Sequence, residues 1–361
     1  MSTRRRDLVG GASALALLSG SSAAFAQNKD PPAESRSKSA AGAGTGGGIT
    51  IQGGSLARPA NQEELKALLQ AACHNGGGIA FDGSTPPIKI SGTLEIRLRD
   101  VGDGGVYLNG NGLRLESTNR DGVTAAVRFI GKTRFLTVQG FNLYGGAYDT
   151  PGCGNGFEFV SSGGDIALST FSNLVASYCG GHGIVFKGAI FESDTYSLKS
   201  KDCRGQGIVF SNQGGVVSNM MMYGTNSSRN AGWGMDLQAG CNSVDMFGGS
   251  FVLNGGGGIN CPNGFRFMIA PNGENTGETM INMPFAAYPA TVIAANLSSN
   301  GRTLNPANPT AKPSRYLINP PANGKLNEIG GFVVPYTENS QPAPSNMSVL
   351  ATQTPATRPK P

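Results

Sequence analysis

Five short stretches of the chain follow one pattern, in which Gly-x-Gly is followed by alternating apolar residues. The units begin at Gly154, Gly181, Gly205, Gly232 and Gly256, which are 27, 24, 27 and 24 residues apart. A fixed period of this length is typical of a solenoid, in which each repeat buries its apolar face only by stacking on its neighbours.

The apolar residues occupy the third and fifth positions after each first glycine. They are Phe157 and Phe159, Ile184 and Phe186, Ile208 and Phe210, Met235 and Leu237, and Ile259 and Cys261. This alternation predicts a short strand with one face in a core. Because a repeat of about two dozen residues leaves no room for a helix, we expect an all-β fold: a single-stranded parallel β-helix of about ten coils.

Aligned units place their residues in columns, which become stacks about 4.8 Å apart in space. One column lies two residues before the first glycine and holds Cys179, Cys203, Asn230 and Asn254. Stacked asparagines at the corners of a β-helix bond one another and the turning backbone, so we interpret this column as structural. A second column holds Tyr196, Tyr223 and Phe247, and we expect these rings to fill the core.

The column between the two glycines should face outward. It holds Asn155, His182, Gln206, Trp233 and Gly257, which include the only tryptophan and one of the two histidines. An outward line of indole, imidazole and amide groups suits sugar binding, because it combines an aromatic plate with hydrogen-bonding groups. Asn155, Gln206 and Trp233 are therefore candidate substrate-binding residues. The alternative is a solvent-facing turn position that tolerates any residue.

Charged residues gather beside this column. Asp202 and Arg229 share a column on neighbouring repeats and should pair, with Arg204 close by. His182 and Asp236 should lie one repeat to either side, so these five residues are the candidate catalytic group. Lyase chemistry needs a base and a positive group, either Ca²⁺ held by carboxylates or a basic side chain. The sequence predicts no definite cofactor and leaves calcium possible. The alternative is a solvated surface ion pair that contributes little.

The two ends of the chain do not follow the repeat. Arg5 and Arg6 open a twin-arginine pattern, and Ala24-Phe25-Ala26 is a small-x-small cleavage site. We expect a signal peptide over 1–26, a linker over 27–48, the β-helix over 49–300, an irregular extension over 301–338 and a disordered tail over 339–361. The apolar part of the signal is too short to span a membrane. We therefore expect a periplasmic or secreted protein that uses the Tat export machinery and is not an integral membrane protein.

The formal net charge of +5 comes from these ends, and the body between them is neutral. A neutral body gives no electrostatic reason to expect a nucleic acid as partner. Six cysteines in an exported chain leave the disulfide state open.

At the N-terminal end of the region between the two chain ends, the sequence predicts a capping helix followed by a first strand. Asn61 to His74 is amphipathic, with Asn61 as cap and Glu64 in the capping-box position, and Gly76-Gly77-Gly78 follows. This start, together with the glycine units, resembles the pectate-lyase-like superfamily of right-handed parallel β-helices over about residues 55–300. That superfamily contains lyases, hydrolases, epimerases, phage tailspikes and non-catalytic members, so the resemblance implies the fold and leaves the activity open.

A local match is found at Cys179–Ile184, which is similar to the Cys-x-x-Gly-His-Gly segment of the polygalacturonase family. The other signatures of that family are missing, including the paired aspartates that inverting hydrolysis requires. We therefore expect a protein that binds a polysaccharide or oligosaccharide and, if it is an enzyme, acts as a lyase or epimerase in preference to a hydrolase. The alternatives are a non-catalytic carbohydrate-binding protein and a structural solenoid of the cell envelope.

Overall fold

The computed structural model describes residues 56–147, 150–263, 265–274, 279–283, 290–298, 316–319, 326–334 and 347–349. The expected signal peptide and linker lie outside the described residues. Among the described residues, no helix is long and apolar enough to cross a membrane.

One α-helix precedes an uninterrupted series of strands. The elements are α1 (Gln62–Asn75), β1 (Gly77–Ala80), β2 (Ile88–Ile90), β3 (Leu94–Leu98), the short 3-10 helix η1 (Gly102–Gly104), β4 (Val106–Ser117), β5 (Val127–Arg134), β6 (Leu136–Tyr144), β7 (Phe157–Ala167), β8 (Thr170–Ser172), β9 (Val175–Ser177), β10 (Ile184–Lys187), β11 (Ile190–Tyr196), β12 (Lys199–Lys201), β13 (Ile208–Ser211), β14 (Val217–Ser228), β15 (Trp233–Leu237), β16 (Asn242–Val252), β17 (Gly257–Asn260), β18 (Phe267–Ile269), β19 (Asn272–Glu274), β20 (Thr279–Asn282), β21 (Ala290–Ser298), β22 (Tyr316–Asn319), β23 (Leu326–Val334) and β24 (Met347–Val349).

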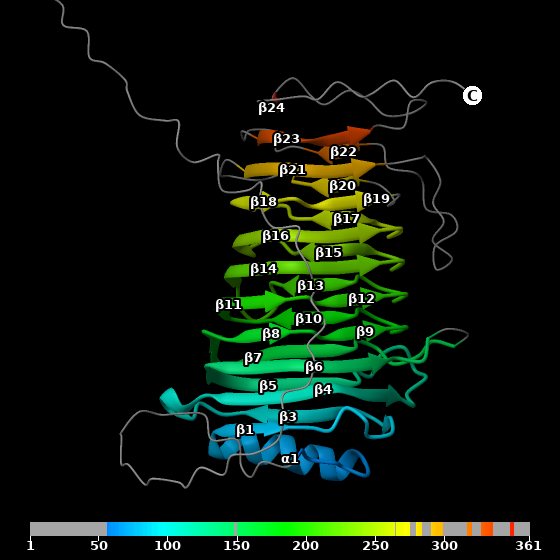
Figure 1. Ribbon diagram of the computed structural model, residues 1–361, viewed down its shortest axis with the longest axis vertical. Helices are drawn as coiled ribbons and strands as arrows, with labels where there is room; N and C mark the ends of the chain where they lie inside the picture. The colour runs from blue at the N-terminus through cyan, green and yellow to red at the C-terminus, as the bar shows by residue number, and fades with distance from the viewer. Residues whose placement is uncertain are drawn as a thin grey trace, which may run out of the picture. The chain divides into compact units, whose positions relative to one another are not determined.

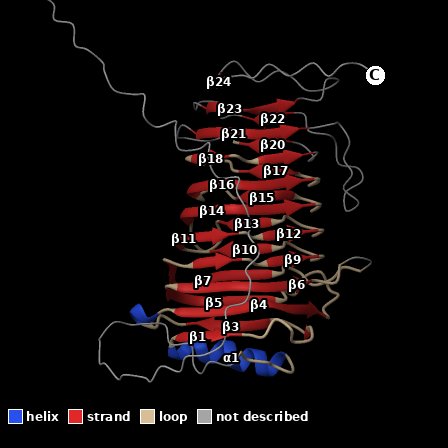
Figure 2. Ribbon diagram, in the orientation of Figure 1, coloured by secondary structure: helices blue, strands red, loops and turns tan. Residues whose placement is uncertain are grey.

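Every strand pairs in parallel with a strand one turn away, which makes the fold a parallel β-helix (Figures 1 and 2). Three ladders run along its axis. One contains the glycine units, in the order β3–β5–β7–β10–β13–β15–β17–β20–β22; a second contains β6, β8, β11, β14 and β16; a third contains β6, β9, β12, β14 and β16. The period of the sequence is confirmed in register, because Phe157 pairs with Ile184, Ile184 with Ile208 and Ile208 with Met235.

The coil count differs from the ten that we expected, since the ladder of the glycine units contains nine strands, each one turn from the next. The first turns are longer than the glycine units suggest. Leu94 pairs with Val127 and Val127 with Phe157, so these turns take 33 and 30 residues. At the other end, β22 and β23 pair in register with β20 and β21. Regular structure therefore continues into the segment for which we expected an irregular extension.

The Gly-x-Gly pattern has a steric cause. A Cβ atom on Gly183 would lie 2.6 Å from the carbonyl oxygen of Gly207 on the next turn. A Cβ atom on Gly181 would lie 2.9 Å from the carbonyl carbon of Gly154 on the previous turn. Because real Cβ atoms do not approach backbone this closely, each unit needs glycine at both positions to stack.

The apolar positions of the glycine units are confirmed as core. All ten of the residues predicted from the alternation are buried, and the rings of Phe159, Phe186 and Phe210 stack along the axis with centroids 5.3 and 5.1 Å apart. Burial of one such side chain contributes about 2 kcal/mol to folding. Helix α1 closes the N-terminal end of this core with Leu65, Leu69 and Cys73, and its cap is also confirmed, since Asn61 Oδ1 accepts from Glu64 N at 3.0 Å.

Corners of the coil recur at residues with a positive φ. One corner column, along the third ladder, contains Tyr178, Asp202, Arg229 and Leu253, with φ between 55° and 59°. A second contains Asn173 and Ser197, with φ of 51° and 52°, and continues through Gly224 and Gly248. The left-handed conformation is rare for residues other than glycine, asparagine and aspartate. Stacking of successive turns therefore imposes it on side chains that do not favour it.

The aromatic column that we expected in the core is on the surface, so that prediction is wrong. Tyr196 is 40% exposed, and Tyr223 and Phe247 are partly exposed. Their inward neighbours are Thr195 and Met222, both fully buried. The sequence suggested the reverse arrangement, because aromatic residues usually lie inside and threonine usually lies at the surface.

Candidate functional site

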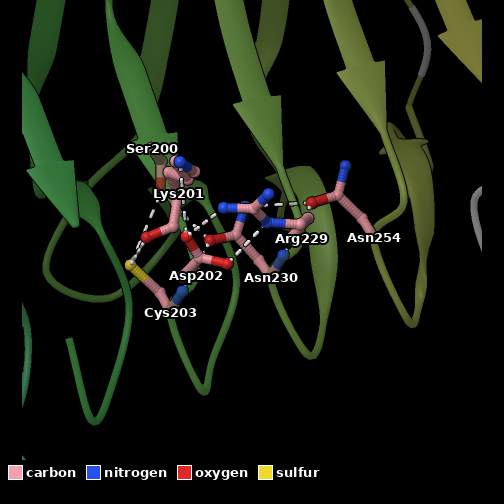
Figure 3. A network of polar contacts seen from close by, with 7 residues as sticks. All are labelled: Ser200, Lys201, Asp202, Cys203, Arg229, Asn230 and Asn254. Carbon is pink, nitrogen blue, oxygen red and sulfur yellow. Dashed lines mark hydrogen bonds and ion pairs between the residues drawn. The ribbon is translucent and has the colours of Figure 1, made fainter. Parts of the chain in front are cut away.

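The predicted pair of Asp202 and Arg229 is formed at a corner of the coil (Figure 3). Both guanidinium bonds are 2.7 Å long, from Nε to Oδ1 and from Nη2 to Oδ2. Lys201 Nζ lies 3.8 Å from the same carboxylate. The side chain of Asp202 is only 11% exposed, compared with 35% for Arg229. The pair is therefore a two-pronged, partly buried interaction rather than the solvated one that was the alternative.

The carboxylate of Asp202 has a further partner in Tyr178, the preceding residue of this corner column. Burial and the neighbouring Asp202 raise the pKa of the Tyr178 hydroxyl, which is hydrogen-bonded to Asp202. Asp202 therefore interacts with a guanidinium and a phenol at once. Arg204, the third member of the predicted group, is exposed, and its side chain makes no hydrogen bond or ion pair within the described part of the chain.

Beneath this corner, the predicted asparagine and cysteine column is confirmed as a buried structural network (Figure 3). Asn230 Nδ2 donates to Asn254 Oδ1 at 2.9 Å, and Asn230 Oδ1 accepts from Cys203 N at 3.0 Å. Cys203 is in hydrogen-bonding contact with Cys179, which also contacts Cys153. All six cysteines are buried and free.

The column predicted to bind sugar is a ladder of hydrogen-bond acceptors. Asn155 Oδ1 accepts from His182 N at 2.9 Å, and His182 Nδ1 accepts from Gln206 N at 2.9 Å. Gln206 Oε1 accepts in turn from Trp233 N. Each side chain thus satisfies the backbone of the next turn, and all four are half-buried. The column has a structural role whether or not it also contacts a ligand.

This bond fixes the tautomer of the neutral His182 ring. Since Nδ1 accepts from a backbone N–H, the proton of the neutral ring is on Nε2. Burial lowers the pKa of His182, and the negative charges of Asp236 and Glu158 oppose the shift. The neutral ring offers a donor at Nε2, and its lone pair is already engaged. It can stabilise a developing negative charge, but it cannot serve as a base without losing the bond to Gln206.

The other groups beside His182 are engaged as well. Asp236 is 9% exposed, and Asn260 Nδ2 donates to its Oδ1 at 2.7 Å. Burial raises the pKa of Asp236, while the Asn260 bond and His182 lower it. Glu158 forms an ion pair with Arg128 at 2.6 Å and accepts from Asn155 Nδ2 at 2.7 Å. Among the described residues, no group of three or more His, Cys, Asp or Glu side chains is arranged to hold a metal ion.

A groove that the sequence reasoning missed runs along the corner column of Asn173 and Ser197. It has a volume of 390 Å³ and is dominated by side-chain amides. Its lining comprises Asn109, Asn111, Gly112, Gln139, Gly140, Asn142, Asn173, Val175, Ser197 and Lys199. Amides offer donors and acceptors at once, which suits ligands rich in hydroxyl groups.

The exposed aromatic column continues one wall of this groove. In register, Gln139 pairs with Ser172, Ser172 with Tyr196, and Tyr196 with Tyr223. The rings of Tyr196, Tyr223 and Phe247 are nearly parallel, with successive centroids 4.8 and 5.0 Å apart. We call this set the aromatic ladder. Met221 and Phe267 in the adjacent outward column are also exposed, and they alternate there with the carboxylates of Asp194 and Asp245.

The comparisons with known proteins bear on the fold. No protein-family model matches the chain, and no curated protein matches it. Among solved structures, the chain is similar to ORF18 of Geobacillus virus E2, with 14% identity, a TM-score of 0.50 and coverage of 75% of this chain and 61% of that one. It is also similar to the A-module of the mannuronan C-5 epimerase AlgE4 from Azotobacter vinelandii, with 11% identity, a TM-score of 0.36 and coverage of 84% and 98%.

The similarity to the viral protein shows a shared fold and nothing further, since only 14% of the residues are identical. This chain spans less than two thirds of the length of that protein. The second similarity is too distant to support an argument about activity.

Proposed function

We propose that this protein binds a polysaccharide along the amide-lined groove and the aromatic ladder. The observation that carries the proposal is that the two are adjacent, since Gln139 lines the groove and its column continues through Ser172 to Tyr196 of the aromatic ladder. Glycan sites combine apolar ring surface with closely spaced hydrogen-bonding groups, and this surface places both kinds along one line. Its length over several turns suits a chain in preference to a single sugar.

Binding is better supported than cleavage. Of the residues predicted for catalysis, Asp202 is paired with Arg229, Asp236 is bonded to Asn260, and the lone pair of His182 is engaged. A lyase or epimerase needs an available base next to the substrate. The second candidate function is a modifying enzyme in which His182 donates from Nε2, and the observation behind it is the negative charge of Asp236 and Glu158 near the ring. We also propose that the protein is exported by the Tat machinery to the periplasm or the medium, on the twin-arginine pattern at Arg5 and Arg6.

A panel of neutral and acidic polysaccharides tests the proposal. The protein from Gln27 onward is sedimented with each insoluble polymer, or run in gels that contain each soluble polymer, with and without calcium. We expect retention by at least one polymer and weaker retention of Tyr223→Ala. Tyr144→Ala is the matched control, because Tyr144 is an exposed tyrosine on the third ladder and is not among the residues that line the groove.

Mass spectrometry of the same mixtures separates binding from chemistry. Recovery of the bound polymer with unchanged mass supports binding without cleavage, whereas unsaturated fragments would establish a lyase. An epimerase would leave the mass unchanged, so the sugar composition of the polymer is measured as well. Failure of every polymer to retain the protein, or equal retention of Tyr223→Ala and the wild type, would overturn the proposal.

A further inference from the structure

Five Asn-Gly pairs lie wholly within the described residues, and their surroundings differ. They begin at Asn109, Asn111, Asn155, Asn254 and Asn272. In such a pair the backbone nitrogen of the glycine can attack the side-chain carbonyl carbon of the asparagine, because glycine has no Cβ to hinder the approach. The reaction requires a side-chain amide that is free to turn and a backbone that can bend. The fold therefore decides which of these pairs reacts.

Asn111 is the open member of this set. Its side chain is exposed, and within the described part of the chain its amide makes no hydrogen bond. Asn111 has a φ of 48°, and Gly112 follows with a φ of 85°. A Cβ atom on Gly112 would meet nothing within 4 Å beyond its chain neighbours, so the space around this residue is open.

Both residues belong to a bulge of β4. Between the paired positions Asn109 and Leu113, residues 110–112 of β4 stand opposite Gly140 alone of β6. The residues of a bulge are left out of the ladder. The backbone at Asn111 can therefore change its conformation without a change of register on either side.

The other four asparagines are half-buried or buried, and the side chain of each is hydrogen-bonded. Asn254 is buried, and both ends of its amide are engaged, as are both ends of the Asn155 amide. The glycines that follow these two are held as well, because Gly156 N donates to a backbone oxygen at 2.9 Å and Gly255 N to another at 2.8 Å. Neither the carbonyl carbon nor the attacking nitrogen is free in these pairs.

We propose that Asn111 is a site of spontaneous deamidation. The backbone nitrogen of Gly112 gives its proton to hydroxide and forms a bond to Cγ of Asn111. The bond from Cγ to the side-chain nitrogen breaks, and this nitrogen takes a proton from water and leaves as ammonia. Water then opens the resulting cyclic imide at either carbonyl group, which gives aspartate or isoaspartate. The net change consumes water and releases ammonia, so no oxidant or reductant is involved.

The reaction changes the amide-lined groove. Asn111 lines this groove, and Lys199 is the only charged residue among those that line it. An amide that can donate and accept becomes a carboxylate that only accepts. Isoaspartate also lengthens the main chain, and it does so inside a bulge, where no ladder bond has to break. The groove surface therefore changes with the age of the molecule while the buried ladders are retained.

The test follows each amide in the folded protein during incubation at mildly alkaline pH. Samples are digested with trypsin and analysed by mass spectrometry, and a sample taken at time zero corrects for reaction during digestion. Peptide 100–114 contains both Asn109 and Asn111, which fragmentation of the peptide distinguishes. The matched controls are Asn155 and Asn254, because glycine follows both. The denatured protein, incubated in parallel, gives the rate of each pair without the fold.

We expect Asn111 to deamidate at least about tenfold faster than Asn155 and Asn254 in the folded protein, because those two pairs react only after local opening. The three rates should converge in the denatured protein. Asn111→Gln should remove the first acidic species that anion-exchange chromatography resolves from the aged protein. Deamidation of Asn111 no faster than that of Asn155 in the folded protein, or an Asn111 amide that persists there while the denatured chain reacts, overturns the proposal.

Discussion

Replacement of Asn230 by alanine should be among the most destabilising single changes in this solenoid. The side chain is fully buried and makes at least four hydrogen bonds. Its Nδ2 donates to Asn254 Oδ1 and Ser227 Oγ, both at 2.9 Å, and its Oδ1 accepts from Cys203 N at 3.0 Å and Ser200 Oγ at 3.3 Å. At about 1 kcal/mol for each buried hydrogen bond, Asn230→Ala should lower the free energy of unfolding by about 4 kcal/mol.

Urea unfolding followed by circular dichroism measures this loss. The control is Asn226→Ala in the same turn, since Asn226 is partly exposed and its Nδ2 donates to Gly224 O at 3.2 Å. Asn230→Asp keeps the shape but sets a carboxylate oxygen against Asn254 Oδ1, so it should destabilise at least as much as alanine at neutral pH. A loss below about 1 kcal/mol for Asn230→Ala, or one no larger than that of Asn226→Ala, would show that the column does not hold the turns together.

Three further outcomes follow from the structure. Because burial lowers the pKa of His182, the folded chain binds fewer protons there than the unfolded chain. Stability should therefore fall as the pH drops below about 6.5, and His182→Gln, which keeps an acceptor, should lose that dependence in urea titrations across the range. Gly183→Ala should lower the unfolding free energy by about 3 kcal/mol or prevent folding, whereas Gly104→Ala, with open space around its Cβ position, should change little in the same assay. Finally, a thiol reagent such as dithionitrobenzoate should react slowly with the native protein and quickly with all six cysteines in denaturant, because each cysteine is buried. Burial also raises the pKa of Cys73 to about 12 and that of Cys241 to about 11. A rapid reaction of the native protein would contradict the burial.

The glycine units could be predicted because their signal is both steric and periodic. Gly183 and Gly207 have no room for a side chain, and Ile184 and Phe186 alternate with the outward positions. Both constraints repeat at every turn, so the period could be recognised even if the pattern of one unit had been interpreted incorrectly. The pairing of Asp202 with Arg229 followed from the same register.

The aromatic ladder could not be placed correctly because a corner lies between it and the glycine units. A residue in the left-handed conformation, such as Ser197, resets which side chains point inward, so alternation cannot be counted through it. The inward positions there include Thr195, whose hydroxyl is buried without a hydrogen-bond partner among the described residues. A buried threonine beside an exposed tyrosine reverses the usual preference, and composition gave no warning.

The groove was missed for a related reason. Its amides come from several turns and from both sides of a corner, and the residues that form it recur at irregular distances in the sequence. Asn109 and Gln139, which both line the groove, share a column that is only visible once the longer front turns are aligned in space. A search for asparagine and glutamine near corner positions would have been the available signal.

The corner column of Tyr178, Asp202, Arg229 and Leu253 separates backbone shape from side-chain identity. Four chemically unrelated residues adopt φ values within a few degrees of one another, because the stacked turns dictate the bend. A chosen series of side chains, about 4.8 Å apart, could therefore be placed along this column by substitution without changing the backbone of the coil. Asparagine would be the most compatible residue at these positions, because it adopts the left-handed conformation at the lowest free-energy cost among residues with a side chain. For the same reason, substitutions in this corner column can change the surface of the protein while the buried residues stay the same.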